Sequence, residues 1–243
     1  MTIQEFEYVI NMKQKNVYHE ISNSLEKYGF CIVKNFIDKE ILYEKLKILR
    51  SKFTSQNDIR ISGPLTFKMY DFQRLDLGDY NQENARFCRN MPFFTWNKGS
   101  VMIDVMQKLI DFRNDYLKLE EKNFLYEING EKLCDLPKFL QYPVGGGFMN
   151  KHTDGVHYHG IMNVLLSLSK RGVDFETGGV YYYDKNGNYI DAEGILDIGD
   201  MYCHDTQTIH GVHAVDAHKS IDLNNLTGRL AVNLSLVHFE DIK

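Results

Sequence analysis

Apolar residues in the first half of the chain recur at helical spacing in two stretches. Residues 17–28 place Val17, Ile21, Leu25 and Tyr28 on one helix face, and Gly29 follows as a stop signal. A second amphipathic run extends from position 98 to about 121, with its apolar face made by Val101, Val105, Leu109, Phe112, Tyr116 and Leu119. We therefore predict one helix over 17–28 and another over 98–121.

The residues between these stretches are less regular. The run FCIVKNF at 30–36 is short, aromatic and β-branched, which predicts a strand. Asp38 then stands where an N-cap would begin a helix that continues to about Phe53. Residues 57–96 mix glycine, proline, aromatic and charged residues without a clean period, so we expect a loop with short elements there.

After the turn signal Asn129-Gly130 the pattern changes to short β-rich runs separated by glycine-containing turns. These runs are FLQYPV from Phe139, IMNVLLSL from Ile161, GVYYYD from Gly179, GILDIGDMYC from Gly194 and RLAVNLSLVHF from Arg229. Short strands at such spacing favour a sandwich or jelly roll, which can hold a site in its mouth. We predict an α+β chain in which a helix-rich region, 1–135, covers a β-rich core, 136–243, within one domain, 1–243.

Composition narrows the functional classes. Lys plus Arg number 28 and Asp plus Glu 33, so the net charge of 28 − 33 = −5 argues against a general nucleic-acid binder. The sequence shows neither a signal peptide nor a stretch of membrane-spanning length, and we expect a cytoplasmic protein with no membrane partner. The four cysteines lie far apart without a CxxC pair, which gives no support to a cysteine-based metal site.

The candidate chemistry lies in a histidine and a carboxylate two residues apart. In an extended chain, His152 and Asp154 point to the same side and can reach one ion together. Such a pair alone is weak evidence, but His210 follows 56 residues later, after enough chain to return to the same end of a barrel. Two imidazoles and one carboxylate leave three coordination positions open, which suits Fe(II) with a bidentate cosubstrate and O₂.

Four segments carry a resemblance in order along the chain: FLQYPVGGGFMNKHTDG, TGGVYYYDKNG, GDMYCHDTQTIHGVHAV and GRLAVNLSLV. Together they resemble the Fe(II)- and 2-oxoglutarate-dependent oxygenase superfamily, in its prolyl-hydroxylase-like and related branches. The resemblance covers roughly the last 105 residues. It implies the double-stranded β-helix fold, with Fe(II), 2-oxoglutarate as cosubstrate and O₂.

The resemblance also implies roles for particular residues. His152, Asp154 and His210 match the iron ligands, and His213, three positions after His210, is a rival that matches less well. Arg229 matches the arginine that binds the far carboxylate of 2-oxoglutarate, for which its guanidinium fork is suited.

Two features depart from the family pattern. The gap of 19 residues between His210 and Arg229 is longer than usual and implies an inserted loop at 216–227. Ala231 stands where the family often has serine, and Tyr142, on the strand before the HxD loop, is the candidate hydroxyl to assist the arginine.

The resemblance favours hydroxylation of a C–H bond in a small molecule, such as an amino acid or a natural-product intermediate. Related halogenases have a small residue at the position of Asp154, so this chain fits hydroxylation better, while desaturation and ring formation remain open. A peptidyl hydroxylase is the alternative enzyme. A non-catalytic cupin-like binding protein is the alternative of another class, but it would not need Arg229.

Other residues in these motifs can be explained by a structural role as well as by a functional one. We expect His157, His159 and His204 to lie in loops or around the metal ligands. In the strand run 181–183, the middle tyrosine should point to one face of the sheet and its two neighbours to the other. Gly178 and Gly179 either allow close backbone approach or start a strand. The basic residues of the region 57–96 are expected in a solvated loop of mixed charge: Arg60, Lys68, Arg74, Arg86 and Arg89.

Overall fold

A computed structural model describes residues 6–52, 73–76, 85–92, 101–119, 125–128, 130–154 and 162–238. The elements before position 130 are β1 Val9–Asn11, α1 Val17–Tyr28, β2 Phe30–Lys34, α2 Lys39–Lys52, β3 Gln73–Asp76, β4 Arg86–Pro92, α3 Ile103–Leu117 and β5 Leu125–Ile128. The elements after it are β6 Glu131–Tyr142, β7 Gly147–His152, β8 Met162–Ser167, β9 Gly179–Tyr183, β10 Tyr189–Ile190, a short 3₁₀ helix Ala192–Gly194, β11 Met201–Asp205, β12 His210–Val215 and β13 Arg229–His238.

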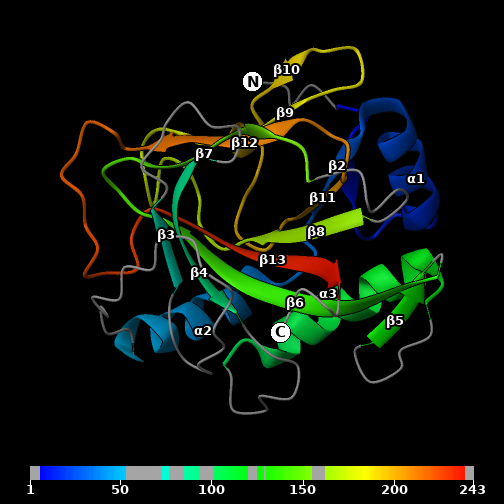
Figure 1. The fold of residues 1–243 in the computed structure, drawn as a ribbon, viewed down its shortest axis with the longest axis horizontal. Coiled ribbons are helices and arrows are strands. Elements are labelled where there is room, and N and C mark those ends of the chain that lie inside the picture. Colours follow the sequence, from blue (N-terminus) through cyan, green and yellow to red (C-terminus); the bar gives the residue numbers. More distant parts are fainter. Residues whose placement is uncertain are drawn as a thin grey trace.

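The described strands join in one curled sheet. Along the main path of the sheet, each strand hydrogen bonds to the next in the order β1-β2-β11-β8-β13-β6-β4-β7-β12-β9-β10. Outside this path, β3 pairs with β4 and β5 pairs with β6. Figure 1 shows α2 and α3 beneath the β6–β13–β8 part of the sheet, while β7, β12 and β9 lie on the opposite side. The sheet therefore folds over on itself, as a double-stranded β-helix does, and the predicted α+β fold is confirmed.

Alternation along the strands divides the apolar residues into two cores. The outer core holds the helices against the sheet and includes Met201 and Cys203 from β11 together with Leu109 from α3. The inner core lies inside the curl and includes Tyr202 from β11 and Leu140 from β6. Because successive side chains point to opposite faces, each long strand serves both cores.

The helices agree with the sequence patterns. Helix α1 has the predicted bounds, and Gly29 ends it in the left-handed region, at φ +85°. Asp38 accepts a hydrogen bond from the backbone N–H of Glu40, 2.8 Å from its Oδ1, at the start of α2. The predicted helix 98–121 is shorter than expected, since α3 begins at Ile103 and ends at Leu117.

Several strands were missed. Residues 57–96 were predicted as a loop with short elements, and the elements described there are β3 and β4, of which β4 pairs with both β6 and β7. In the run from Gly194, only Met201–Asp205 is strand, and the residues before it include the 3₁₀ helix. Strands β1, β5, β7, β10 and β12 were not predicted as separate elements, because each has at most six residues and no clean alternation.

The structure describes the predicted turn at 129–130 only in part and the predicted loop at 216–227 in full. Ile128 lies opposite Glu131 in the β5–β6 pair, which fits the predicted two-residue turn, and Gly130 has φ +83°; position 129 lies outside the described residues. The loop predicted at 216–227 does connect β12 to β13. It packs closely on Gly145, where an added Cβ would lie 2.4 Å from the Cα of Ile221.

None of the described helices has both the length and the apolar character of a membrane-spanning helix.

The outer core generates a stability prediction. Leu109 of α3 is fully buried, so Leu109→Ala should lower the free energy of unfolding by about 2–5 kcal/mol through lost contacts and the cavity that remains. Ile41 of α2 is 51% exposed, and Ile41→Ala should cost well under about 1 kcal/mol. Urea denaturation of the two variants tests this; equal losses would contradict the assignment of Leu109 to the core.

Candidate metal centre

Two histidines face each other across neighbouring strands. His152 is the last residue of β7 and His210 the first of β12, and the two are direct partners in the antiparallel register. Their ring centroids are 4.3 Å apart, and the residues are 8% and 9% exposed. The β7–β12 register shifts between His210 and Val212, so a local irregularity adjoins the histidine pair.

Asp154 completes the group from the segment that follows β7. Its backbone N–H donates to the carbonyl of Thr206, at 2.9 Å, which anchors this segment to the one that follows β11. Its Oδ1 lies 3.5 Å from Nε2 of His152 and its Oδ2 lies 3.7 Å from Nε2 of His210. One ligand atom from each of the three residues lies within 4.8 Å of the others, so the structure brings together the three residues predicted from the sequence.

The backbone fixes which nitrogen of each histidine faces the centre. Nδ1 of His152 lies 2.7 Å from the carbonyl of Asn150, and Nδ1 of His210 lies 2.9 Å from the carbonyl of Thr208. A carbonyl only accepts, so each Nδ1 carries the proton and each Nε2 presents a lone pair. Nε2 of His152 is buried and hydrogen bonds to nothing in the described structure, which fits a metal ligand whose partner is an ion.

The electrostatics also fit metal binding. Burial, together with the nearby His204, lowers the pKa of His210 to about 3, so the imidazole is neutral at pH 7. Burial alone would raise the pKa of Asp154, but the neighbouring imidazoles outweigh it and hold that pKa well below its usual value. A neutral imidazole and an ionised carboxylate are the forms that bind metal ions.

A third histidine supports the carboxylate without joining the group. Nε2 of His204 lies 2.9 Å from Oδ2 of Asp154, and its Nδ1 lies 3.0 Å from the hydroxyl of Tyr182. The side-chain amide of Asn163 also donates to Oδ2. His204 therefore lies next to the ligand group, as predicted, and orients Asp154.

Tyr182 comes from the middle of the tyrosine run on β9. Its ring stacks on Phe30, with centroids 4.6 Å apart, inside the curl of the sheet. Tyr181 instead stacks on His213, with centroids 4.2 Å apart. His213 is exposed and lies 3.1 Å from the hydroxyl of Tyr189, so it does not compete with His210 for the centre.

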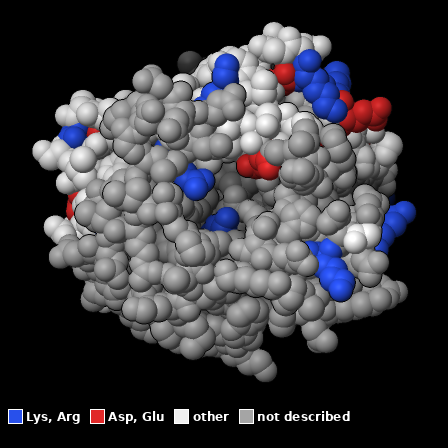
Figure 2. Space-filling model, viewed as in Figure 1, with Lys and Arg blue, Asp and Glu red and all other residues white. Residues whose placement is uncertain are grey.

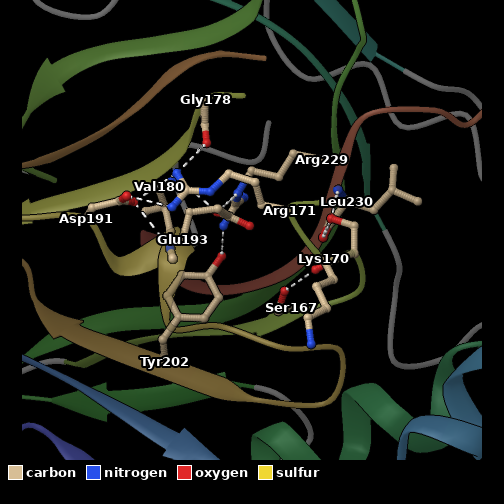
Figure 3. A network of polar contacts seen from close by, with 12 residues as sticks. Ser167, Lys170, Arg171, Gly178, Val180, Asp191, Glu193, Tyr202, Arg229 and Leu230 are labelled. Carbon is tan, nitrogen blue, oxygen red and sulfur yellow. Dashed lines mark hydrogen bonds and ion pairs between the residues drawn. The ribbon is translucent and has the colours of Figure 1, made fainter. Parts of the chain in front are cut away.

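Arg229 lies inside the curl, at the start of β13 and 1% exposed (Figure 3). Its Nε donates to Oε2 of Glu193 at 2.6 Å, and its Nη2 donates to the hydroxyl of Tyr202 at 2.7 Å. Its Nη1 hydrogen bonds to none of the residues that the structure describes. The guanidinium is therefore held at two corners, and its third corner makes no hydrogen bond to a described residue.

Glu193 is the counter-ion that the sequence patterns did not reveal. Its Oε2 also accepts from the backbone N–H of Val180 at 2.9 Å, whereas its buried Oε1 has no partner. The side chain passes directly over Gly179, where an added Cβ would lie 2.2 Å from Cγ of Glu193. At Gly178 an added Cβ would lie 2.3 Å from the carbonyl oxygen of Ala214, so both glycines allow close approach.

Tyr142 lies beside Arg229 as predicted, since the two are direct partners in the β6–β13 register. The guanidinium lies 5.6 Å from the centroid of the Tyr142 ring, and burial raises the pKa of this phenol. The hydroxyl points to Sδ of Met149 at 3.7 Å, which is a weak contact. Tyr202 holds Arg229 more directly, because its hydroxyl accepts a hydrogen bond from the guanidinium. Tyr202 and His204 are two residues apart on β11, and this spacing was the sequence signal that could have revealed both.

Some of the predicted surroundings cannot be placed. His157 and His159 lie outside the described residues, as do Arg60 and Lys68, and of Arg74 only the backbone is described. Arg86 and Arg89 are on strand β4 and not in a loop. Arg89 points away from the centre, donating to the side chain of Gln141 and the carbonyl of Leu223.

Comparison with known proteins gives no match to a protein-family model and none to a curated protein sequence. Solved structures do match. A prolyl hydroxylase from Trichoplax adhaerens, in complex with a hypoxia-inducible-factor peptide fragment, aligns at TM-score 0.57 and 14% identity over 93% of this chain and 91% of its own.

Two further structures match over similar lengths. A 2OG-Fe(II) oxygenase family oxidoreductase from Burkholderia pseudomallei aligns at TM-score 0.53 and 9% identity over 93% of this chain and 94% of its own. The non-heme α-ketoglutarate-dependent epimerase SnoN of nogalamycin biosynthesis aligns at TM-score 0.53 and 11% identity over 91% of this chain and 82% of its own. The chain thus has the fold of these oxygenase structures and carries a His-Asp-His group in its curled sheet.

Proposed function

We propose that this chain is an Fe(II)- and 2-oxoglutarate-dependent oxygenase that hydroxylates a C–H bond of a small molecule. The observation that carries the proposal is the convergence of His152, Asp154 and His210, with the Nε2 of His152 buried and without a hydrogen-bond partner in the described structure. Two imidazoles and a carboxylate on one side of an ion leave the other side open, which suits ferrous iron.

In this proposal the ion and its cosubstrate supply the oxidation, in which O₂ is consumed, 2-oxoglutarate becomes succinate and CO₂, and one oxygen atom enters the substrate. The chain holds the reacting groups in place and keeps water away from them. Its ligands emerge from paired strands and therefore keep their relative places. The inner core around Tyr182 and Tyr202 excludes water from the space beneath them.

Asp154 is positioned by two hydrogen bonds to one of its oxygens. His204 and Asn163 both contact Oδ2, and Oδ1 makes no hydrogen bond to a described residue. We therefore assign Oδ1 as the oxygen that binds the ion. The hydrogen bonds from Tyr182 through His204 to Asp154 would hold the carboxylate plane fixed around a bound ion.

Arg229 is assigned to the far carboxylate of 2-oxoglutarate. Its Nη1 is available, and the hydroxyl of Tyr202 accepts from Nη2, so the proton of that hydroxyl can be donated to the same carboxylate. Tyr142 lies against the same guanidinium and is assigned to the cosubstrate pocket. A binding protein of the cupin type would have no use for this arrangement beside a metal centre.

The substrate class is a small molecule in this proposal, and a peptidyl hydroxylase is the alternative. The similarity to SnoN supports small-molecule chemistry, and the similarity to a peptide-bound prolyl hydroxylase supports the alternative. Assays with small-molecule and peptide libraries, scored by succinate release and a product mass increased by one oxygen, distinguish the two. Release with neither library and no metal uptake would favour a binding protein.

Loss of a metal ligand should abolish both metal binding and turnover. His152→Ala or His210→Ala should weaken Mn(II) binding by more than about 100-fold, beyond the range for losing a supporting partner. Mn(II) titration followed by electron paramagnetic resonance measures this. His213→Ala is the matched control, because His213 lies on the outer face, and it should bind Mn(II) as the wild type does. Equal loss in His213→Ala would contradict the assignment.

His204 should affect the metal affinity of the centre without being a metal ligand itself. His204→Phe removes one of two hydrogen bonds to Oδ2 of Asp154 and should weaken Mn(II) binding by about 10–100-fold. Titration calorimetry with Mn(II) gives the affinity, and thermal unfolding of the metal-free protein separates it from a folding defect. An affinity unchanged in a folded His204→Phe variant would show that His204 does not position Asp154.

Arg229 should set the affinity for 2-oxoglutarate. Arg229→Lys keeps the charge opposite Glu193 but loses the fork, so the Kd for 2-oxoglutarate should rise at least about tenfold in the Mn(II)-loaded protein. Arg171→Lys is the control, since Arg171 pairs with Asp191 at 2.6 Å and donates to the carbonyl of Gly178 (Figure 3), and no hydrogen bond joins it to Arg229 in the described structure. Calorimetric titration compares them, and an unchanged Kd in Arg229→Lys would refute the assignment.

A further inference from the structure

Two other cationic residues share the inner face of the sheet with the metal centre. Lys138 lies on β6 at the same two-residue period as Leu140 and Tyr142, which both belong to the inner core. Arg86 lies on the adjacent β4, two residues before the inner-core residue Cys88, and pairs across to Met149 of β7. Both side chains therefore start on the inside of the curl.

Neither cation forms a hydrogen bond or an ion pair within the described part of the chain, although the carboxylate of Asp154 lies close enough to Lys138 to act on its charge. Nε of Arg86 is buried without a hydrogen-bond partner, and Lys138 has no hydrogen bond or ion pair there. Two arginines that are almost fully buried form ion pairs, Arg113 with Asp135 at 2.6 Å and Arg229 with Glu193 at 2.6 Å. Arg86 and Lys138 are each partly buried, and the Nε of Arg86 is fully so. Positive groups held away from water without an ion pair are costly, so two in one place point to a partner that is not part of the chain.

Lys138 lies close enough to both Arg86 and the metal centre to interact with them. Burial lowers the pKa of Lys138, the positive charge of Arg86 lowers it further, and the carboxylate of Asp154 raises it. Figure 2 shows the molecule, viewed as in Figure 1, hollowed near its middle, with basic and acidic atoms at the wall of the hollow. A carboxylate that approached Lys138 and Arg86 would meet two positive charges.

We propose that Arg86 and Lys138 form a subsite for an anionic group, a carboxylate, of the primary substrate. This inference rests on the proposed function and adds the substrate class: a small acid whose reacting C–H bond is presented to the metal centre while its carboxylate binds the two cations. Charge-assisted hydrogen bonds from a guanidinium and an ammonium suit a carboxylate. The substrate is thereby held at one end, which orients the rest.

The lysine of the subsite lies apart from the place assigned to 2-oxoglutarate, whereas Arg86 lies near enough to Tyr142 for its positive charge to lower the pKa of that phenol. Arg229 lies opposite Tyr142, whereas Lys138 lies opposite Asn233. Tyr142 and Lys138 are four positions apart on β6, a distance of about 13 Å along an extended strand. Arg229 forms an ion pair with Glu193, whereas Arg86 and Lys138 form none in the described structure.

The test uses acetate as the carboxylate probe. Protein loaded with Mn(II) and saturated with 2-oxoglutarate is titrated with ¹³C-labelled acetate, and broadening of the acetate resonance by the nearby Mn(II) reports binding. The wild type should broaden acetate but not the neutral acetamide. Lys138→Met and Arg86→Met should each weaken acetate binding about tenfold or more, and Lys138→Arg should retain it.

The matched control is Lys132→Met, because Lys132 is an exposed lysine on the same strand and should bind acetate as the wild type does. Equal broadening in Lys138→Met and the wild type would overturn the proposal. So would a fall in 2-oxoglutarate affinity equal to the fall in acetate affinity, because the cations would then serve the cosubstrate. If the wild type takes up Mn(II) but not 2-oxoglutarate, the proposed function fails, whereas acetate binding that depends on Lys138 would still stand.

Discussion

The pairing of His152 with His210 across β7 and β12 is the contact on which the site depends. Because the two residues are direct register partners, their imidazoles must project to the same side of the sheet. The carbonyls of Asn150 and Thr208 then fix each ring with its Nε2 toward the centre. Asp154 needs only to follow β7 by two residues to reach the same point, so the geometry comes from the sheet and not from a flexible loop.

Strands that carry the residues supporting the centre also hold the helices. On β11, Met201 and Cys203 face the outer core while Tyr202 and His204 face inward, to Arg229 and Asp154. A shift of this strand by one residue would exchange the two sets of side chains. Stability and function therefore share a single register, and the packing of α3 on the outside fixes the positions of the polar residues inside.

The local patterns predicted what depends on neighbours in sequence. The bounds of α1, the cap at Asp38 and the pair His152 and Asp154 follow from spacings of a few residues, and the structure agrees with them. The partners of Arg229 could not be found in this way, because Glu193 meets it from a short 3₁₀ helix 36 residues earlier. Strand β4 was missed because it pairs only with segments distant in sequence.

The inner space combines two kinds of positive group. Arg229 is neutralised within the chain by Glu193, while Arg86 and Lys138 have no such partner among the residues described. In the proposed function two acids bind at once, and the two kinds of group would serve them differently: one is held rigidly for a cosubstrate that is always the same, and the other is left open for the substrate. On that proposal the unbalanced charge belongs to the binding site.

Crystals grown with Mn(II) and measured at its absorption edge test the central claim most directly. We predict one strong anomalous peak bonded to Nε2 of His152, Nε2 of His210 and Oδ1 of Asp154, with the remaining positions facing the inner space. A peak elsewhere, or a peak that lacks any one of these three side chains, would contradict the assignment of the metal centre.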